Sequence, residues 1–178
     1  MLEQVGGEAK AMINARGRSA GHVLEGLALC AAAVVLTALV AAASPARRSP
    51  AAGIAPAKGT PPRSTLQTMW PALFLVLTLS GLRVWNAPRS RERSQALGFW
   101  AAVQALNALW MAWSPRLQGA QLATAAASLG AGMGYANAAR KVDPTAAALV
   151  SPYLGWSSFA GLITGQVWTR NRPRPTVH

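Results

Sequence analysis

The feature that most constrains this sequence is the separation of its charged residues from five long apolar stretches. Each stretch has about the 20 residues that a helix needs to cross the hydrocarbon core of a bilayer. Inside them, the charged residues are Glu25 and Arg83, although the chain has 17 Lys and Arg and 5 Asp and Glu. A soluble bundle would carry charges on the outward faces of its helices. The pattern therefore predicts an all-α integral membrane protein, a bundle of five transmembrane helices, at residues 22–43, 66–86, 96–114, 118–139 and 145–168.

The polar segments divide the chain into three parts. We expect a polar, flexible N-terminal segment at 1–21, the transmembrane domain at 22–168 and a basic C-terminal tail at 169–178. Before the last helix, Asp143 or Thr145 is expected to cap the helix, with Pro144 in its first turn.

The first apolar stretch has two interpretations. Basic residues precede it, and it ends in Ala41-Ala42-Ala43-Ser44, which resembles the cleavage site of a signal peptide. The stretch is longer than the apolar region of a typical signal peptide and contains Glu25. These two features favour a helix that is retained in the membrane.

Charge and composition exclude several function classes. The net charge is +12, but eight Lys and Arg fall on each side of the predicted membrane, so the positive-inside rule gives no orientation. A positive charge divided between the two membrane faces favours anionic lipid head groups, rather than nucleic acid, as its binding partner. Cys30 is the one cysteine and the two histidines lie near opposite ends, so neither a disulfide nor a metal site is expected. No catalytic constellation is recognisable, and we expect that the protein is not an enzyme.

Small residues recur every four residues on the last two predicted helices. They allow two helix backbones to approach closely in lipid. They pack helices within the bundle or form the contact of a homodimer, and the sequence leaves both open. These residues are Ala126, Gly130, Gly134 and Ala138 on the fourth helix, and Gly161 and Gly165 on the fifth.

Seven tryptophans are present, and several share a helix face with polar residues. On the third helix, Gln104 and Asn107 lie on one stripe with Trp100 and Trp110. A side-chain amide is costly in a membrane unless it finds a partner. The amides either bond to a neighbouring helix or line a cavity, where aromatic walls and a few polar atoms suit a flat apolar ligand.

Four motifs resemble those of a known family. Residues 142–160 read VDPTAAALVSPYLGWSSFA, and residues 105–110 read ALNALW. Trp70 is followed by Trp85 fifteen residues later, and Pro61-Pro62 precedes Trp70. In order and spacing, the motifs resemble the TspO/MBR family of tryptophan-rich sensory proteins and translocator proteins, also called peripheral benzodiazepine receptors.

The resemblance implies a five-helix bundle, often dimeric, in a lipid bilayer. It implies a pocket within the bundle for tetrapyrroles (protoporphyrin IX or haem), sterols or benzodiazepine-type ligands, used in sensing or transport, with no cofactor required. Some members promote light-dependent porphyrin breakdown. Carried over position by position, the ligand-binding residues are Trp70, Trp85, Asn107, Trp110, Trp156 and Ala160.

The sequence also departs from the family pattern. The tryptophans that flank the loop prolines in the family are replaced by Gly59 and Ser64, and the sterol-motif tyrosine corresponds to Gly165. We therefore expect no sterol contact of that kind. A second function class also stays open, in which the protein is a structural or regulatory membrane scaffold that has lost ligand binding.

Overall fold

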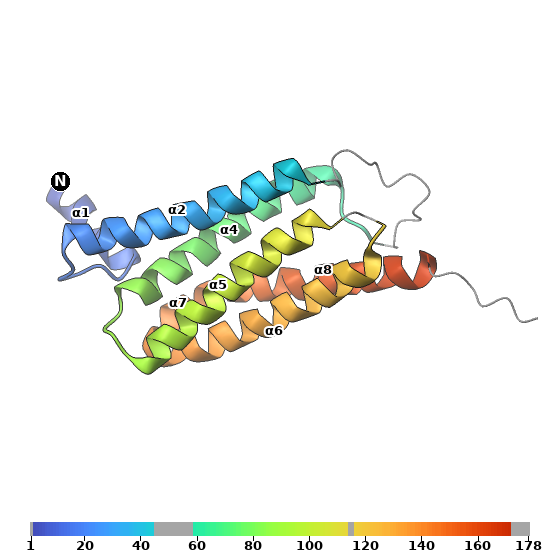
Figure 1. Ribbon diagram of the computed structural model, residues 1–178. Coiled ribbons are helices and arrows are strands. Elements are labelled where there is room, and N and C mark those ends of the chain that lie inside the picture. Colours follow the sequence, from blue (N-terminus) through green and yellow to red (C-terminus); the bar gives the residue numbers. More distant parts are fainter. Residues whose placement is uncertain (1, 45–58, 114–115, 172–178) are drawn as a thin grey trace, which may run out of the picture.

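Long helices lie side by side in the computed structural model, which describes residues 2–44, 59–113 and 116–171 (Figure 1). All regular secondary structure in these ranges is helical, which confirms the predicted all-α class. The helices are α1 (Leu2–Met12), α2 (Ala20–Ala43), α4 (Arg63–Asn86), α5 (Arg91–Ala112), α6 (Gln118–Val142), α7 (Pro144–Leu149) and α8 (Ser151–Asn171).

The five longest of the described helices form a closed bundle. Helix α2 packs against α5, α5 against α6 and α6 against α8, while α4 packs against α2, α5, α7 and α8. Short α1 lies at the end of the bundle where α2 begins (Figure 1). This end, called here the N-terminal end, also holds the turn between α4 and α5 and the turn between α6 and α7.

Three helical segments within the described ranges are long and apolar enough to cross a membrane. They are Ala20–Ala43, Thr68–Asn86 and Pro144–Asn171. Helices α5 and α6, with 22 and 25 residues, also have the length that a span needs. They are less apolar because α6 is rich in Ala and Gly, and α5 begins with charged residues.

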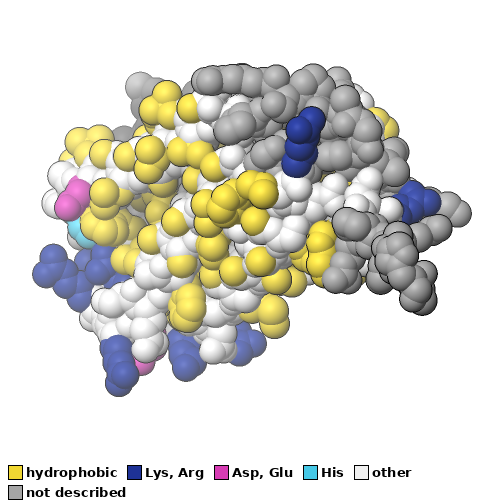
Figure 2. Space-filling view, turned by 45° about the vertical axis from the view of Figure 1, so that its right-hand side comes forward, with side chains coloured by type: hydrophobic (Ala, Val, Ile, Leu, Met, Phe, Trp, Pro, Cys, Tyr) yellow, Lys and Arg dark blue, Asp and Glu magenta, His cyan; other side chains and the backbone are white. Residues whose placement is uncertain are grey.

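The molecular surface fits a lipid environment. Large apolar side chains point outward on several helices; Leu36 is 61% exposed, Leu75 60% and Leu162 69%. Figure 2 shows apolar side chains over the middle of one face and several Lys and Arg side chains along one end. This is the distribution expected of a protein whose middle contacts hydrocarbon and whose ends contact head groups.

The structure differs from the predicted division of the chain in three places. The segment 1–21 was expected to be flexible, but it contains α1, and this helix is tied to the bundle: Arg83 Nη1 donates to the carbonyl oxygens of Ala11 and Met12, at 3.1 and 2.7 Å.

The last membrane helix, expected as one element at 145–168, is two helices that meet at Val150. Pro152 explains the break, because a proline cannot donate a backbone hydrogen bond to the preceding turn. Of the expected basic tail, α8 takes in 169–171, and residues 172–178 lie outside the described ranges.

The buried charge of Arg83 is neutralised by Asp143. Arg83 Nε lies 2.9 Å from Asp143 Oδ2, and both side chains are mostly buried, at 13% and 6% exposure. Asp143 also accepts hydrogen bonds from the backbone N–H groups of Thr145 and Ala146, at 2.9 and 3.2 Å. Asp143, rather than Thr145, is therefore the predicted cap, with Pro144 in the first turn of α7. The Asp143 carboxylate thus caps α7 and binds Arg83 of α4, and Arg83 in turn holds the end of α1.

Candidate functional site

Three of the predicted tryptophans meet inside the bundle from three different helices. The ring centroid of Trp70 on α4 lies 6.0 Å from that of Trp110 on α5 and 6.4 Å from that of Trp156 on α8. Phe74 lies 5.9 Å from Trp70, and Phe159 lies 5.6 Å from Trp156. We call these five residues the aromatic cluster. Offset and edge-to-face pairs at such separations attract one another beyond the burial of their area, so the cluster fixes the positions of its rings.

Asn107 lies beside the cluster and bonds to two neighbouring helices. Its Oδ1 atom accepts hydrogen bonds from the hydroxyls of Tyr153 at 2.8 Å and Ser128 at 3.3 Å. Its Nδ2 atom is buried without a partner among the described residues. Of the two predicted roles for the amide, the oxygen thus serves helix packing, while the nitrogen remains available to a ligand or a water molecule.

Gln104, one turn before Asn107, is also buried. Neither its Oε1 nor its Nε2 has a partner within the described ranges. A buried amide without partners costs free energy, so this position is poorly satisfied by the protein alone.

The space between the predicted ligand-binding residues is small. Trp70, Asn107, Trp110 and Ala160 line a void of about 30 Å³, which holds about one water molecule. A neighbouring hollow of about 110 Å³ is bordered by Trp110, Trp156 and Ala160. The structure therefore brings these five predicted residues together, but in a packed arrangement with no room for a macrocycle.

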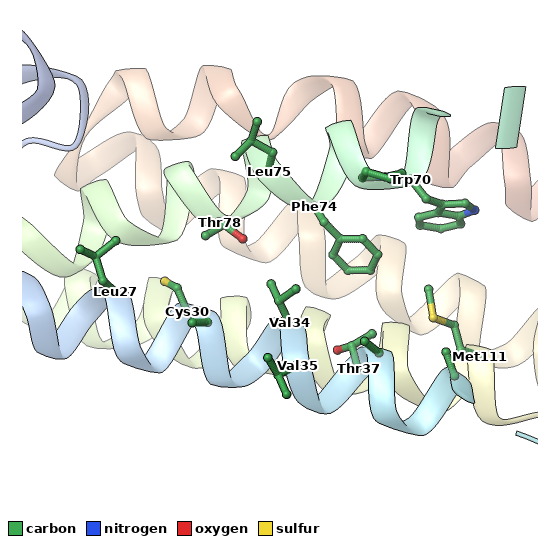
Figure 3. Close-up of a pocket in the computed structure, with 14 residues that line it drawn as sticks. Leu27, Cys30, Val34, Val35, Thr37, Trp70, Phe74, Leu75, Thr78 and Met111 are labelled. Carbon is green, nitrogen blue, oxygen red and sulfur yellow. The ribbon is translucent and has the colours of Figure 1, made fainter. Parts of the chain in front are cut away.

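A much larger cavity lies directly beside the cluster, between α2 and α4. Its volume is about 750 Å³, within the range of roughly 300–1,000 Å³ that is usual for small-molecule sites. Figure 3 shows Trp70, Phe74 and Thr78 of α4 on one side, with residues of α2 such as Val34 and Thr37 on the other. Met111 of α5 lies at the end near Trp70. We call this space the α2–α4 groove.

The α2–α4 groove is almost entirely apolar and opens toward the outside of the bundle. Val35 and Leu75, on opposite walls, are 55% and 60% exposed. Among its few polar atoms is Thr78 Oγ1, which is buried without a partner in the described structure. The α2 wall was not predicted from the sequence, although Ala31, Ala38 and Ala41 recur on one face of that helix and their small side chains leave space beside α4.

Trp85 lies apart from the other predicted ligand-binding residues, at the N-terminal end. Its indole N–H donates to the carbonyl oxygen of His22 at 3.0 Å, and its ring stacks on the His22 ring at 5.3 Å. The guanidinium of Arg93 covers its ring at 5.2 Å from the centroid. Trp85 therefore joins α2, α4 and α5 at the opposite end from Trp70.

The predicted small-residue positions divide into two groups. Gly134 packs against Phe99, Gly165 lies near Leu122, and Ala138 is buried, so these positions pack helices within the bundle. Gly130 and Gly161 have open space where a side chain would be, and Ala126 is exposed.

Three glycines outside these stripes also make very close helix contacts. A methyl group on Gly81 would lie 2.5 Å from Trp100 Nε1, and one on Gly132 would lie 2.8 Å from Leu154 Cδ2. Gly26 is in similarly close contact with the ring of Trp85. These glycines did not stand out in the sequence because none of them belongs to the two regular stripes.

Comparison with known proteins supports the same architecture. Residues 26–169 match the TspO/MBR family. The chain is 31% identical to the translocator protein of Bos taurus over 118 residues, which are 64% of this chain and 70% of the bovine protein. It is 34% identical to the translocator protein of Sus scrofa over 130 residues, 69% of this chain and 75% of the porcine protein. With a match that extends over most or all of each of the five long helices, this integral membrane protein belongs to the TspO/MBR family.

Proposed function

We propose that this membrane protein binds a flat, largely apolar tetrapyrrole, such as protoporphyrin IX or haem, for sensing or transport. The observation that supports this best is the α2–α4 groove, with its volume of about 750 Å³ beside the aromatic cluster. A tetrapyrrole presents an extended apolar face, and burial of that face against an apolar wall is favourable at about 25 cal/mol per Å².

Trp70 is the central residue of the proposed site. It lines both the α2–α4 groove and the small void next to Asn107. In this proposal, Trp70 and Phe74 offer ring faces to the ligand, while Trp110 and Trp156 pack behind Trp70 and hold its orientation. Asn107 and Ala160 form the tightly packed wall behind them. Trp85 has no direct contact with the ligand in this arrangement.

The alternative function is a scaffold or regulatory protein without ligand affinity. The specific observation in its favour is that the space among Trp70, Asn107, Trp110 and Ala160 is only about 30 Å³. If the ligand of this family can bind only there, the side chains of this protein exclude it.

A titration with protoporphyrin IX distinguishes the two functions. The full chain in detergent is titrated while its tryptophan emission is followed. Ala38→Phe places a ring into the α2–α4 groove, while Ala32→Phe makes the same change at an exposed position of α2 outside the groove. We expect saturable quenching that Ala38→Phe weakens about tenfold or more, equivalent to about 1.4 kcal/mol, and that Ala32→Phe leaves unchanged.

Each other result has a definite meaning. Absence of saturable quenching in the unmodified chain would support the scaffold function. Equal affinity in all three proteins would place the ligand outside the α2–α4 groove. Illumination of the complex then tests for light-dependent breakdown, which would appear as loss of the Soret band.

We also propose that the protein forms a homodimer through the open part of α6. Ala126 and Gly130 are exposed there, and no atom of a neighbouring helix among the described residues lies within 4 Å of the Cβ position of Gly130. Small residues at such a face let a second helix approach closely. Light scattering on the detergent-solubilised chain is expected to give a dimer, and Gly130→Leu is expected to give a monomer. A monomer in the unmodified chain would refute this proposal.

A further inference from the structure

A polar cavity lies at the N-terminal end, far from the aromatic cluster. Its volume is about 300 Å³. The residues that line it include Gly17, Arg18, Ser19, His22, Arg89 and Arg93. Three of these side chains are guanidinium groups, and no carboxylate is among the described residues that line the cavity.

The protein holds two of the three arginines in place. Arg93 is only 8% exposed, and its Nε and Nη2 atoms donate to the carbonyl oxygen of Trp85 at 3.1 and 2.7 Å. Arg18 Nε donates to the carbonyl oxygen of Asn86 at 2.6 Å. These bonds anchor both guanidinium groups at the C-terminal end of α4, and they use only part of the five N–H donors that each group carries.

No carboxylate among the described lining residues balances the three guanidinium charges of the cavity. Arg93 lies before the predicted membrane segment of α5. Its pKa is lowered, mainly by burial and to a smaller extent by repulsion from Arg89 and Arg18. The backbone contributes partial charges of both signs. Ser19 caps the positive N-terminus of α2, while the carbonyl oxygens of Trp85 and Asn86, at the negative C-terminus of α4, accept hydrogen bonds from Arg93 and Arg18.

The position of the cavity indicates which kind of anion it would bind. Arg18, Arg89 and Arg93 lie within a few residues of the predicted spans 22–43, 66–86 and 96–114, all at the same end of the bundle. This is the depth of lipid head groups. Guanidinium groups bind phosphate oxygens through paired, charge-assisted hydrogen bonds.

We infer that the cavity formed by Arg18, Arg89 and Arg93 is a binding site for a phosphate group, such as that of an anionic phospholipid. His22 and Ser19 add a ring nitrogen and a hydroxyl near the same cavity. This site is separate from the proposed tetrapyrrole site, and neither depends on the other.

The test measures binding of a fluorescent phosphatidylglycerol to the detergent-solubilised full chain. Unlabelled phosphatidylglycerol, phosphatidylcholine and inorganic phosphate serve as competitors at constant ionic strength. Arg89→Gln removes a cavity arginine that is exposed and makes no described bond to the backbone, so the fold is retained. Arg91→Gln is the matched control: it removes the same charge from an exposed position in the same turn, outside the cavity.

We expect phosphatidylglycerol to compete about tenfold better than phosphatidylcholine, whose choline group is repelled by the arginines. Arg89→Gln should weaken binding of phosphatidylglycerol about tenfold, as expected for loss of a hydrogen bond to a charged group. Arg91→Gln should change it less than about twofold. Equal competition by the two lipids, or equal losses in the two variants, would overturn the inference. Displacement by millimolar inorganic phosphate would identify free phosphate as a second source of the ligand, whereas resistance to it would identify the lipid alone.

Discussion

Trp70 of α4 and Trp156 of α8 meet edge to face, with their ring centroids 6.4 Å apart and their planes at 85°. Only Trp70 of this pair lines the α2–α4 groove. The two residues therefore have different roles in the proposed site: Trp70 contacts the ligand, and Trp156 supports Trp70.

Replacement of Trp70 should weaken ligand binding more than replacement of Trp85. Trp70→Leu removes the ring face that borders the α2–α4 groove, and we expect the affinity for protoporphyrin IX to fall about tenfold or more. Trp85→Phe is the comparison, because Trp85 stacks on His22 at the other end of the bundle. The measurement is the quenching titration, corrected for the missing tryptophan. An equal effect of the two variants would show that the ligand does not contact Trp70 directly.

Loss of the Arg83–Asp143 ion pair should destabilise the protein strongly. Arg83→Met leaves the carboxylate of Asp143 buried, at 6% exposure, without its cationic partner. Removal of one member of a buried pair costs about 3–5 kcal/mol, and Arg83 also donates to two carbonyl oxygens of α1. Unfolding in detergent, followed by circular dichroism, measures the loss. Arg140→Met, at an exposed position of α6, should be nearly neutral; similar losses in both variants would contradict the proposed contribution of the pair.

Two glycine-to-alanine changes should have opposite effects on stability. In Gly81→Ala the new methyl group would lie 2.5 Å from Nε1 of Trp100, and that atom is held by a hydrogen bond of 3.0 Å to the carbonyl oxygen of Leu77. Overpacking of this kind costs about 1–3 kcal/mol. Gly98→Ala, at an exposed position of α5, meets open space, so its better helix propensity should stabilise the protein by up to about 1 kcal/mol. Thermal unfolding of both variants measures the difference, and a Gly81→Ala protein as stable as the parent would show that Trp100 can move aside.

Asn107→Leu should cost about 1–2 kcal/mol of folding free energy. It removes the acceptor of the Tyr153 and Ser128 hydroxyls, which keep only their bond to each other, at 2.9 Å. Asn137→Leu makes the same exchange at an exposed position of α6 and should change stability little. Equal unfolding temperatures for Asn107→Leu and the parent would show that the leucine packs as well as the hydrogen-bonded amide.

Much of the helix architecture was accessible from the sequence, because apolar length is a local property of the chain. The gathering of Trp70, Trp110 and Trp156 followed from the resemblance of their motifs, and the structure brings them together. Trp85 could have been separated from this group on geometry alone. Fifteen residues of α-helix place it about 22 Å along the helix from Trp70, farther than a compact pocket extends.

Other features depend on tertiary contacts that no local pattern records. Helix α1 includes Gly6 and Gly7, which disfavour a helix, and its end is held by Arg83, about seventy residues away in sequence. The α2–α4 groove depends on how far apart two helices stand, which is set by side chains from both. The arginine-lined cavity draws its residues from two segments that lie far apart in sequence, 17–22 and 87–93, so each arginine looked like an ordinary loop charge.

The outward opening of the α2–α4 groove determines how a ligand would arrive. Its rim carries exposed apolar residues such as Val35 and Leu75, which lie near the middle of α2 and α4, two helices apolar enough to cross a membrane. A hydrophobic molecule would then enter sideways after it has dissolved in the bilayer. Occupancy of the groove would then depend on the mole ratio of ligand to lipid. Addition of more membrane at a fixed total amount of ligand would dilute the ligand in the bilayer and lower its occupancy of the protein.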